Sequence, residues 1–430
     1  MEPSNTKAYL VKPFPLYSAV RKRQNLHSAW KKVFANGIRS QSQETKNQVR
    51  TFAEDAFRYL DRLQRQLREG KFNFDPATGV LIPRPGKAPR PIVIASIENR
   101  IVQRSILEVL QNHYAIQPYV LVPNSFGGLK DDNGGRRVQD AAFKAWQEAT
   151  NGKGWYLRSD IKSFFTQIDR TKVLGIVGKL IDDTLFLNLL EAALATELEN
   201  LDSLKEKRDL FPIYEIGVAQ GCCLSPLVGN ILLHDFDLKM NQRGITCLRY
   251  IDDFLILGKK RQHVERAFDT ALKHLESLGL TAYHPMTNPE KADFGRTDNG
   301  FEFLGCHISP EKIRPSKKSC QNLLEKIDQA LRYSSRRMTS PNSLRPEKLA
   351  LVDTLKSVSN MLEGWGNQYS FCNCDELLQD LDRQIDERLS KYLGIYTNYR
   401  ERFQDSATSL RRLLGVHPLV DSYSDPKIPH

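Results

Sequence analysis

R-Y-I-D-D-F-L-I-L, residues 249–257, is the stretch around which the chain is organised. Two adjacent aspartates, Asp252 and Asp253, lie between short apolar runs of β-forming residues, which are typical of strands. Because an aspartate pair suits a turn better than a strand interior, we expect a hairpin with both acids at its tip. Adjacent carboxylates raise each other's pKa unless a cation lies between them, and magnesium is a usual partner. A solvated turn is the alternative, since so short a pattern also occurs by chance.

A second acid arrives in a matching setting. Asp160 ends another β-type run, W-Y-L-R-S-D at residues 155–160, after which the sequence turns helical. If Asp160 and Asp252 lie on neighbouring strands of one sheet, their carboxylates can converge on a pair of metal ions. Two metals roughly 4 Å apart would activate an attacking hydroxyl and stabilise a leaving pyrophosphate. Asp169 and the Asp pair at 182–183 sit in helical sequence, and we expect them on the solvated surface.

Composition and charge indicate an intracellular protein with a polyanionic partner. The 430 residues, 40% of them hydrophobic, suffice for two or three packed subdomains. No apolar stretch approaches the roughly 18 residues of a membrane span, and the N-terminus lacks a signal-peptide pattern. Seven cysteines without framework spacing indicate a reducing compartment, so we expect a cytoplasmic location. The formal net charge of +11 favours nucleic acid as the partner over an anionic membrane surface.

A cationic hairpin is predicted near the start of the chain. Two β-type runs, V-L-I-P at 80–83 and P-I-V-I at 91–94, flank a Pro/Gly turn that carries Arg84, Lys87 and Arg90. Three cations on a stiff hairpin are suited to holding a triphosphate, although solubility alone would also account for them.

Helical periodicity dominates both ends of the chain. The basic residues 1–75 contain an amphipathic stripe over 52–67 that ends at Gly70, and residues 96–113 and 262–278 predict two further helices. Beyond residue 310 three more stripes are expected to pack as core. They consist of Leu323, Leu324, Ile327 and Leu331; of Leu349, Val352, Leu355 and Leu362; and of Leu377, Leu378, Leu381, Ile385 and Leu389.

Positive charge is concentrated in the same C-terminal region. Residues 306–350 hold ten Lys or Arg and four Asp or Glu, a net of +6, which is more than half of the excess of the whole chain. The cations on the outer faces of these helices are therefore a candidate surface for gripping a duplex through its phosphates, without reading its sequence.

Glycine-rich segments mark places where the backbone passes close to something. S-F-G-G at 125–128 precedes G-G-R-R at 134–137, which alone is a weak phosphate signal. G-V-A-Q-G-C-C-L-S-P at 217–226 combines a glycine for close approach, an amide and a Ser-Pro helix start. F-E-F-L-G-C at 301–306 is typical of a further strand.

Together these motifs resemble those of reverse transcriptases, most closely the group II intron type, over roughly residues 25–400. The shared motifs, in family order, are R-P-I-V-I-A-S-I-E-N-R-I-V-Q, S-F-G-G with the following G-G-R-R, L-R-S-D-I-K-S-F-F, Q-G-C-C-L-S-P-L-V-G-N-I-L-L, Y-I-D-D, N-P-E-K and F-E-F-L-G. The resemblance implies an α+β right-hand polymerase with an antiparallel-sheet palm, mixed fingers and a helical thumb. The implied domains are an N-terminal helical extension at 1–75, fingers and palm at 76–310, a basic thumb at 311–400 and a tail at 401–430.

Candidate site residues follow by matching the family motifs position by position. Asp160, Asp252 and Asp253, together with Ile161, match the metal-binding positions and imply two Mg²⁺ ions as cofactors. The positions matched to deoxynucleotide binding are Arg84, Lys87, Arg90, Phe165, Gln220, Gly221 and Lys291. Within that set, Phe165 matches the bulky gate that excludes a ribose 2′-hydroxyl, and Lys291 resembles the lysine proposed to protonate the leaving pyrophosphate. Phe303, Leu304 and Gly305 resemble the primer grip.

Departures from the family pattern narrow the subfamily. The Gly-x-Pro-Gly-x-Asp stretch of intron proteins, the paired cysteines of an HNH endonuclease, and the retron and diversity-generating signatures are missing. The chain is then most similar to free-standing bacterial defence-associated reverse transcriptases. This implies cDNA synthesis from an associated noncoding RNA in antiphage defence, with an RNA/DNA duplex and dNTPs as partners and no membrane. A group II intron maturase and an inert RNA-binding scaffold are the alternatives, while the template, the primer and the oligomeric state stay open.

Overall fold

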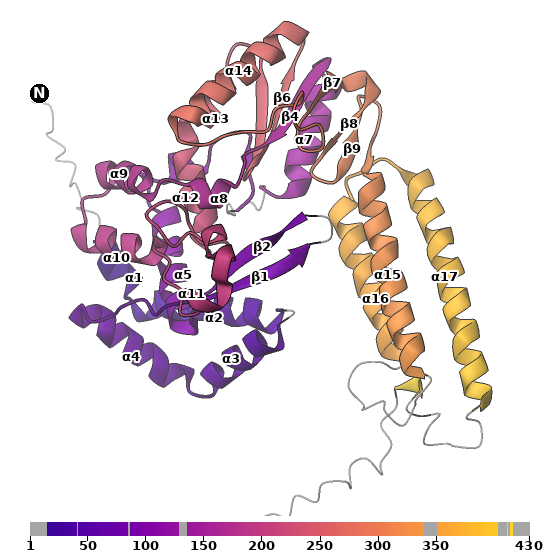
Figure 1. The fold of residues 1–430 in the computed structure, drawn as a ribbon, viewed down its shortest axis with the longest axis horizontal. Helices are drawn as coiled ribbons and strands as arrows, with labels where there is room; N and C mark the ends of the chain where they lie inside the picture. The colour runs from indigo at the N-terminus through magenta and orange to yellow at the C-terminus, as the bar shows by residue number, and fades with distance from the viewer. Residues whose placement is uncertain are drawn as a thin grey trace, which may run out of the picture. The chain divides into compact units, whose positions relative to one another are not determined.

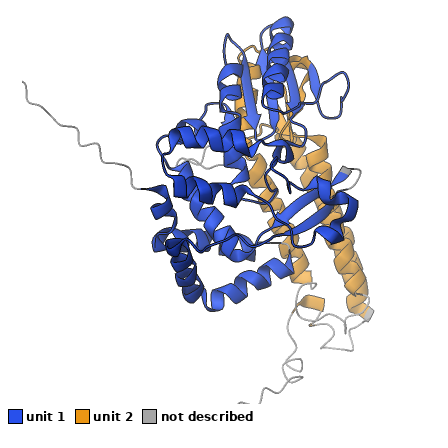
Figure 2. Cartoon of the chain, turned by 60° about the vertical axis from the view of Figure 1, so that its left-hand side comes forward, with its two compact units in different colours: residues 1–137, 155–294 blue, residues 138–154, 295–430 orange. Residues whose placement is uncertain are grey.

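The chain folds into two compact units, drawn as a ribbon in Figure 1 and coloured by unit in Figure 2. The computed structural model describes residues 15–40, 42–84, 87–128, 136–338, 351–402, 411 and 413–415. The first unit comprises residues 1–137 and 155–294, and the second comprises 138–154 and 295–430. The finer division at residues 75, 310 and 400 stays a prediction. Within the described ranges, every helix is too short or too polar to cross a bilayer.

The first unit begins with a group of packed helices. These are α1 (Leu16–Val20), α2 (Arg23–Ile38), α3 (Gln43–Glu54), α4 (Ala56–Glu69) and α5 (Ile97–Gln111). Of these, α1, α2 and α3 contact α5, while α4 contacts α2 and α3. The stripe over 52–67 belongs to two helices rather than one, because Asp55, at φ −138° and ψ 38°, interrupts the helical backbone between α3 and α4. Gly70 ends α4 in the left-handed conformation, as predicted.

The cationic hairpin is confirmed. β1 (Thr78–Arg84) and β2 (Lys87–Ile94) pair antiparallel, and a small core of Ala77, Val93, Leu198 and Phe211 fills the base of the hairpin. The following helix, α5, starts where the sequence predicted, because the Ser96 hydroxyl caps it by accepting the Asn99 N–H at 3.2 Å.

A five-stranded sheet forms the centre of the first unit. Its strands, in the order β3-β5-β6-β4-β7, are β3 (Ser125–Phe126), β5 (Thr246–Tyr250), β6 (Asp253–Gly258), β4 (Trp155–Asp160) and β7 (Asp293–Arg296), and the chain passes into the second unit within β7. β4, β6 and β5 are antiparallel, whereas the short β3 runs parallel to β5. Helices α13 (His234–Met240) and α14 (Arg261–Ser277) pack on these strands (Figure 1).

Shorter helices connect the strands. They are α6 (Gln117–Val120), α8 (Phe164–Gln167), α9 (Arg170–Leu180), α10 (Thr184–Leu194), α11 (Leu201–Leu204), the 3₁₀ helix η1 (Lys205–Leu210) and α12 (Ser225–Leu232). The expectation that Asp169 and Asp183 lie within helical sequence was wrong. Each caps a helix, since the Asp169 carboxylate accepts the Lys172 N–H at 3.1 Å and that of Asp183 accepts the Phe186 N–H at 3.0 Å.

The second unit combines one early helix with the C-terminal part of the chain. Its elements are α7 (Val138–Thr150), η2 (Thr297–Asn299), β8 (Phe301–Phe303), β9 (Cys306–Ile308), β10 (Ile313–Pro315), α15 (Lys317–Met338), α16 (Leu351–Tyr369) and α17 (Asp375–Arg402). The single strand expected over 301–306 is a hairpin instead. Leu304 and Gly305, at φ 49° and 81°, turn the chain between β8 and β9.

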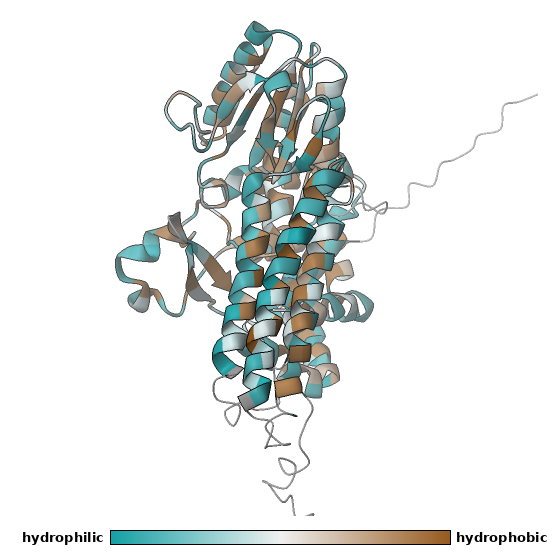
Figure 3. Cartoon of the chain, turned by 90° about the vertical axis from the view of Figure 1, so that its right-hand side faces the viewer, coloured by the Kyte–Doolittle hydropathy of each residue, from teal (hydrophilic) through white to brown (hydrophobic). Residues whose placement is uncertain are grey.

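Helices α15, α16 and α17 share a core, and hydrophobic residues recur at intervals along them between hydrophilic ones (Figure 3). The predicted stripes of α15 and α17 contribute buried Leu323, Ile327, Leu331, Leu381 and Ile385. The α16 stripe was partly wrong, because Val352 is 58% exposed while Val358 is buried in its place. Leu349 lies outside the described residues.

Candidate active site

The structure brings the three predicted carboxylates to one end of the sheet. Asp160, the last residue of β4, is the direct partner of Asp253, the first residue of β6, in the antiparallel register. Asp252 lies in the turn between β5 and β6, so the predicted hairpin with acids at its tip is present. The Ile161 N–H donates to the Asp252 carbonyl at 3.0 Å, which ties the turn to the end of β4.

Burial and the charges of neighbouring carboxylates raise the pKa values of Asp252 and Asp253. Burial, followed by the charge of Asp160, raises the pKa of Asp252 to about 6 from the usual value near 3.8. Burial, followed by the charges of Asp160 and Asp252, raises the pKa of Asp253 to about 7, although Arg158 and Lys291 oppose the shift. A cluster of this kind favours the arrival of a cation.

Lys291 supplies one cation from the chain itself. Its Nζ donates to Asp160 Oδ2 at 3.0 Å, and it lies 5.2 Å from the centre of the Tyr283 ring. Burial would lower the pKa of Lys291, but the hydrogen bond and charge of Asp160 outweigh it and raise that pKa. Tyr283 is itself fixed by its N–H, which donates to the Asp160 carbonyl at 3.1 Å.

The donor set fits a hard divalent cation, since carboxylate oxygens are the ligands that Mg²⁺ prefers. Within the part of the chain that the structure describes, no three His, Cys, Asp or Glu side chains already surround a common point. Lys291 holds one oxygen of Asp160 in this arrangement. A metal ion held by Asp160, Asp252 and Asp253 would either replace Lys291 at Asp160 Oδ2 or bind through the other carboxylate oxygens.

The hairpin cations differ in their surroundings. Arg90 is exposed on β2. Its charge partly opposes the rise in the pKa of Asp252, so the two residues are close enough to interact electrostatically. Arg84 is turned back on its own hairpin, where its Nε and Nη2 donate to the Ala88 carbonyl at 2.9 and 2.8 Å. The side chain of Lys87 lies outside the described residues.

Gln220 and Gly221 are fixed against the hairpin. The Val93 N–H of β2 donates to the Gln220 carbonyl at 2.9 Å. Gly221 has φ 110°, and a Cβ at this position would lie 2.9 Å from the Val93 carbonyl oxygen. Only glycine fits so close an approach without displacing the backbone, and the predicted glycine therefore has a local structural reason.

Phe165 lies at the start of α8, five residues after Asp160. Its ring is half-buried, with its centre 5.3 Å from that of Phe164, and its carbonyl accepts the Val218 N–H at 2.7 Å. This hydrogen bond connects the Phe165 backbone to the segment that leads into Gln220. The predicted nucleotide residues Phe165, Gln220 and Arg90 thus belong to one connected region of the first unit.

The predicted primer grip belongs to the second unit. Phe303, Leu304 and Gly305 form the turn between β8 and β9. The Gly305 carbonyl accepts the Ser319 hydroxyl at 3.0 Å, and Tyr369 of α16 donates to the Ser319 hydroxyl at 3.0 Å. This turn is therefore braced by α15 and α16.

Sequence reasoning missed the buried ion pair behind the carboxylates. Arg249 of β5 is 1% exposed and contacts Asp237 of α13, which is 3% exposed. The only signal in the sequence was an arginine inside an otherwise apolar strand. Such a residue needs a buried partner, but the sequence does not say which acid provides it.

Comparisons with known proteins agree on one family. The sequence model described as "Reverse transcriptase (RNA-dependent DNA polymerase)" matches residues 82–308, more than half of the chain. An uncharacterized 91 kDa protein in the cob intron of Schizosaccharomyces pombe is 31% identical over 41% of this chain, which spans 20% of that protein. Protein YkfC of Escherichia coli is 23% identical, covering 59% of this chain and 72% of its own. Group II intron-encoded protein LtrA of Lactococcus lactis is 26% identical, covering 53% and 34%.

Proposed function

This chain belongs to the reverse transcriptase family, and we propose that it synthesises DNA on an RNA template by two-metal nucleotidyl transfer. The observation that carries the proposal is Asp160 facing Asp253 across β4 and β6, with Asp252 in the adjoining turn. Polymerases of this family generally use divalent metal ions. Asp160, Asp252 and Asp253, together with Ile161, would hold two Mg²⁺ ions, which would activate the primer hydroxyl and stabilise the departing pyrophosphate.

Two cations of the chain would act on the triphosphate. Arg90 would bind the phosphates, because it is exposed and its charge reaches the carboxylates. Lys291 would give a proton to the leaving pyrophosphate, since the raised pKa keeps its amine protonated at neutral pH. Arg84 would first have to leave the Ala88 carbonyl, which makes it a weaker candidate.

Sugar and base would be placed by the region around Gln220. Phe165 would exclude a ribose 2′-hydroxyl, and Gln220 with Gly221 would contact the incoming deoxynucleotide. The support is the hydrogen bond from the Val93 N–H to the Gln220 carbonyl, which attaches this segment to β2, the strand that also carries Arg90.

A primer-extension assay on an RNA template tests the proposed activity. Asp160→Asn keeps the shape of the side chain but removes its charge, and we expect it to lower kcat by about 10³-fold or more. RNA binding should be retained, because the proposed duplex surface lies on the helices beyond residue 310 and not on the strand that carries Asp160. Asp182→Asn, an exposed acid in the same unit, is the control and should extend normally.

Two results would oppose the proposal. Full activity of Asp160→Asn would refute the role of the carboxylates. A wild-type protein that binds RNA but never extends a primer would favour the inert scaffold.

We further propose that the template is a noncoding RNA and that the cDNA serves antiphage defence in the cytoplasm. The support is the resemblance of the sequence motifs to those of defence-associated bacterial reverse transcriptases. The likeness to LtrA, a group II intron-encoded protein, favours an intron maturase as the second candidate. Sequencing the RNA and DNA that copurify with the protein separates the two. One short RNA with complementary cDNA supports the first, and intron RNA supports the second.

A further inference from the structure

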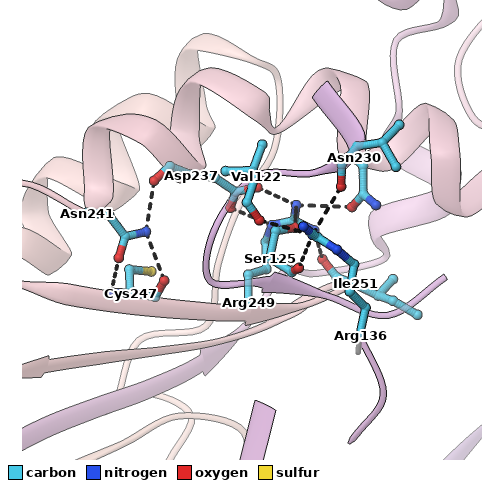
Figure 4. Close-up of polar contacts among 10 residues, drawn as sticks. Val122, Ser125, Arg136, Asn230, Asp237, Asn241, Cys247, Arg249 and Ile251 are labelled. Carbon is cyan, nitrogen blue, oxygen red and sulfur yellow. Dashed lines mark hydrogen bonds and ion pairs between the residues drawn. The ribbon is translucent and has the colours of Figure 1, made fainter. Parts of the chain in front are cut away.

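The carboxylate turn is supported by a buried arginine that the proposed chemistry does not use. Arg249 donates from Nε and Nη2 to the two Asp237 oxygens at 2.7 and 2.5 Å. Nη2 also lies 2.6 Å from the Ser125 hydroxyl and 3.1 Å from the Asn230 amide oxygen. Elements β3, α12, α13 and β5 therefore meet at one guanidinium, as Figure 4 shows.

The remaining nitrogen of Arg249 reaches the turn itself. Nη1 donates to the Ile251 carbonyl at 2.8 Å, and that carbonyl belongs to the peptide bond joining Ile251 to Asp252. Ile251 has φ 61°, which a β-branched residue adopts only where its surroundings impose it. The arginine thus holds the orientation of the peptide that presents Asp252.

Residues 125–128, the S-F-G-G segment, pack closely against the same turn. The Ile251 N–H donates to the Phe126 carbonyl at 3.2 Å. A Cβ on Gly127 would lie 2.9 Å from Ile251 Cγ1, and one on Gly128 would lie 2.3 Å from Pro226 Cβ. These glycines therefore allow the segment to approach the turn and α12, which gives the motif a role other than phosphate binding.

A second arginine holds this segment in place. Arg136 Nη1 donates to the carbonyls of Val120, Val122 and Ser125 at 3.1, 3.0 and 2.8 Å (Figure 4). The Gly127 N–H donates in turn to the Arg136 carbonyl at 2.9 Å. The support behind the turn is consequently a connected network of charged and backbone groups, and most of it is buried.

We propose that Arg249, held by Asp237, is a positioning residue that sets the carboxylates of the turn for metal binding and catalysis. The proposal deepens, and rests on, the function proposed above. It differs from a purely structural role in one respect. A purely structural ion pair could be replaced without loss of catalysis wherever folding is kept, whereas a positioning arginine could not.

The double variant Arg249→Met, Asp237→Leu separates the two roles. Replacing both partners of a buried ion pair with apolar residues of similar volume is often neutral for stability, whereas removing one partner leaves an unpaired buried charge. The double variant should therefore fold, but its Ile251 carbonyl has lost the arginine donor. We expect kcat for primer extension to fall 10- to 100-fold, with KM for dNTP changed less than 3-fold.

Metal binding gives a readout that does not depend on turnover. Titration of the variant with Mn²⁺ alone, followed by calorimetry, should show an affinity about 10-fold weaker than that of the wild type. The control is Arg261→Met, Glu265→Leu, an exposed pair on α14 with N···O 2.9 Å, which should leave kcat and Mn²⁺ affinity unchanged. If the wild type extends no primer, the proposed function fails, while the Mn²⁺ comparison still tests the positioning.

Arg249→Lys covers the case in which the double variant does not fold. Lysine keeps the positive charge beside Asp237, but a single ammonium group cannot reproduce the planar set of donors that also reaches Ile251, Ser125 and Asn230. The same losses of kcat and Mn²⁺ affinity are expected. Wild-type kcat and Mn²⁺ affinity in either folded variant would overturn the proposal.

Discussion

The fold makes ionisation of the Asp252 and Asp253 carboxyls unfavourable, and a bound metal ion would offset this cost. Both carboxyls have raised pKa values, about 6 and about 7, and both shifts arise first from burial. A raised pKa means that the folded protein binds the proton more tightly than the unfolded chain does. The resulting stability is fully present below the ordinary pKa near 4 and is lost as the pH rises through the folded value.

Asp253→Asn should therefore stabilise the metal-free protein at pH 8. The amide removes a buried charge whose cost is about 1–4 kcal/mol from the size of the shift, and the gain should vanish near pH 4. Thermal melts in EDTA across this pH range measure the difference in Tm. The exposed Asp209→Asn is the control. A Tm gain that is independent of pH would show that charge is not the cause.

At the scale of elements, the contact between β2 and the Gln220–Gly221 segment links the cationic hairpin to the segment proposed to contact the nucleotide. Gly221→Ala would bring its Cβ against the Val93 carbonyl and strain a backbone at φ 110°. We expect KM for dNTP to rise about 10-fold, with about 1–2 kcal/mol of stability lost.

Gly175→Ala is the matched control, because its Cβ meets nothing within 4 Å on helix α9. It should leave KM unchanged and slightly favour the helix. An unchanged KM in Gly221→Ala would show that the segment can shift without affecting nucleotide binding.

The elements also show what a sequence can and cannot reveal. Hairpins and helices with strong periodicity, such as β1–β2, α5 and α14, were predicted because local residues decide them. The break at Asp55, the turn at Leu304 and the exposure of Val352 were missed, because the spacing of apolar residues alone does not reveal them. In the candidate site, the motifs were enough to pick out the three carboxylates. The Lys291–Asp160 bond and the Arg249 network could not be predicted, because they join residues from separate motifs and elements.

At the scale of the whole molecule, the positive charge of the chain is unevenly spread. Exposed Lys318 and Lys326 on α15 belong to the region that carries more than half of the net charge. If these lysines contact duplex phosphates, Lys318→Ala with Lys326→Ala should reduce the slope of log K against log salt by about 0.9 per lost contact. Binding of an RNA/DNA duplex across a salt series measures the slope.

The exposed Lys179→Ala on α9, in the other unit, is the control for that measurement and should leave the slope unchanged. An unaltered slope in the double lysine variant would place the duplex on another surface.

The second unit is built from two separated pieces of chain, and this has a consequence for synthesis on the ribosome. Gln139 and Thr150 of α7 donate to the carbonyls of Asn367 and Pro310, residues that are translated much later. The interval between residues 154 and 295 is about 140 residues, or roughly 7–28 s of elongation at ordinary rates. Throughout that time the nascent α7 lacks these partners, while the intervening strands and helices of the first unit emerge. The order of translation therefore allows the sheet that carries the carboxylates to form before the later part of the second unit has been synthesised.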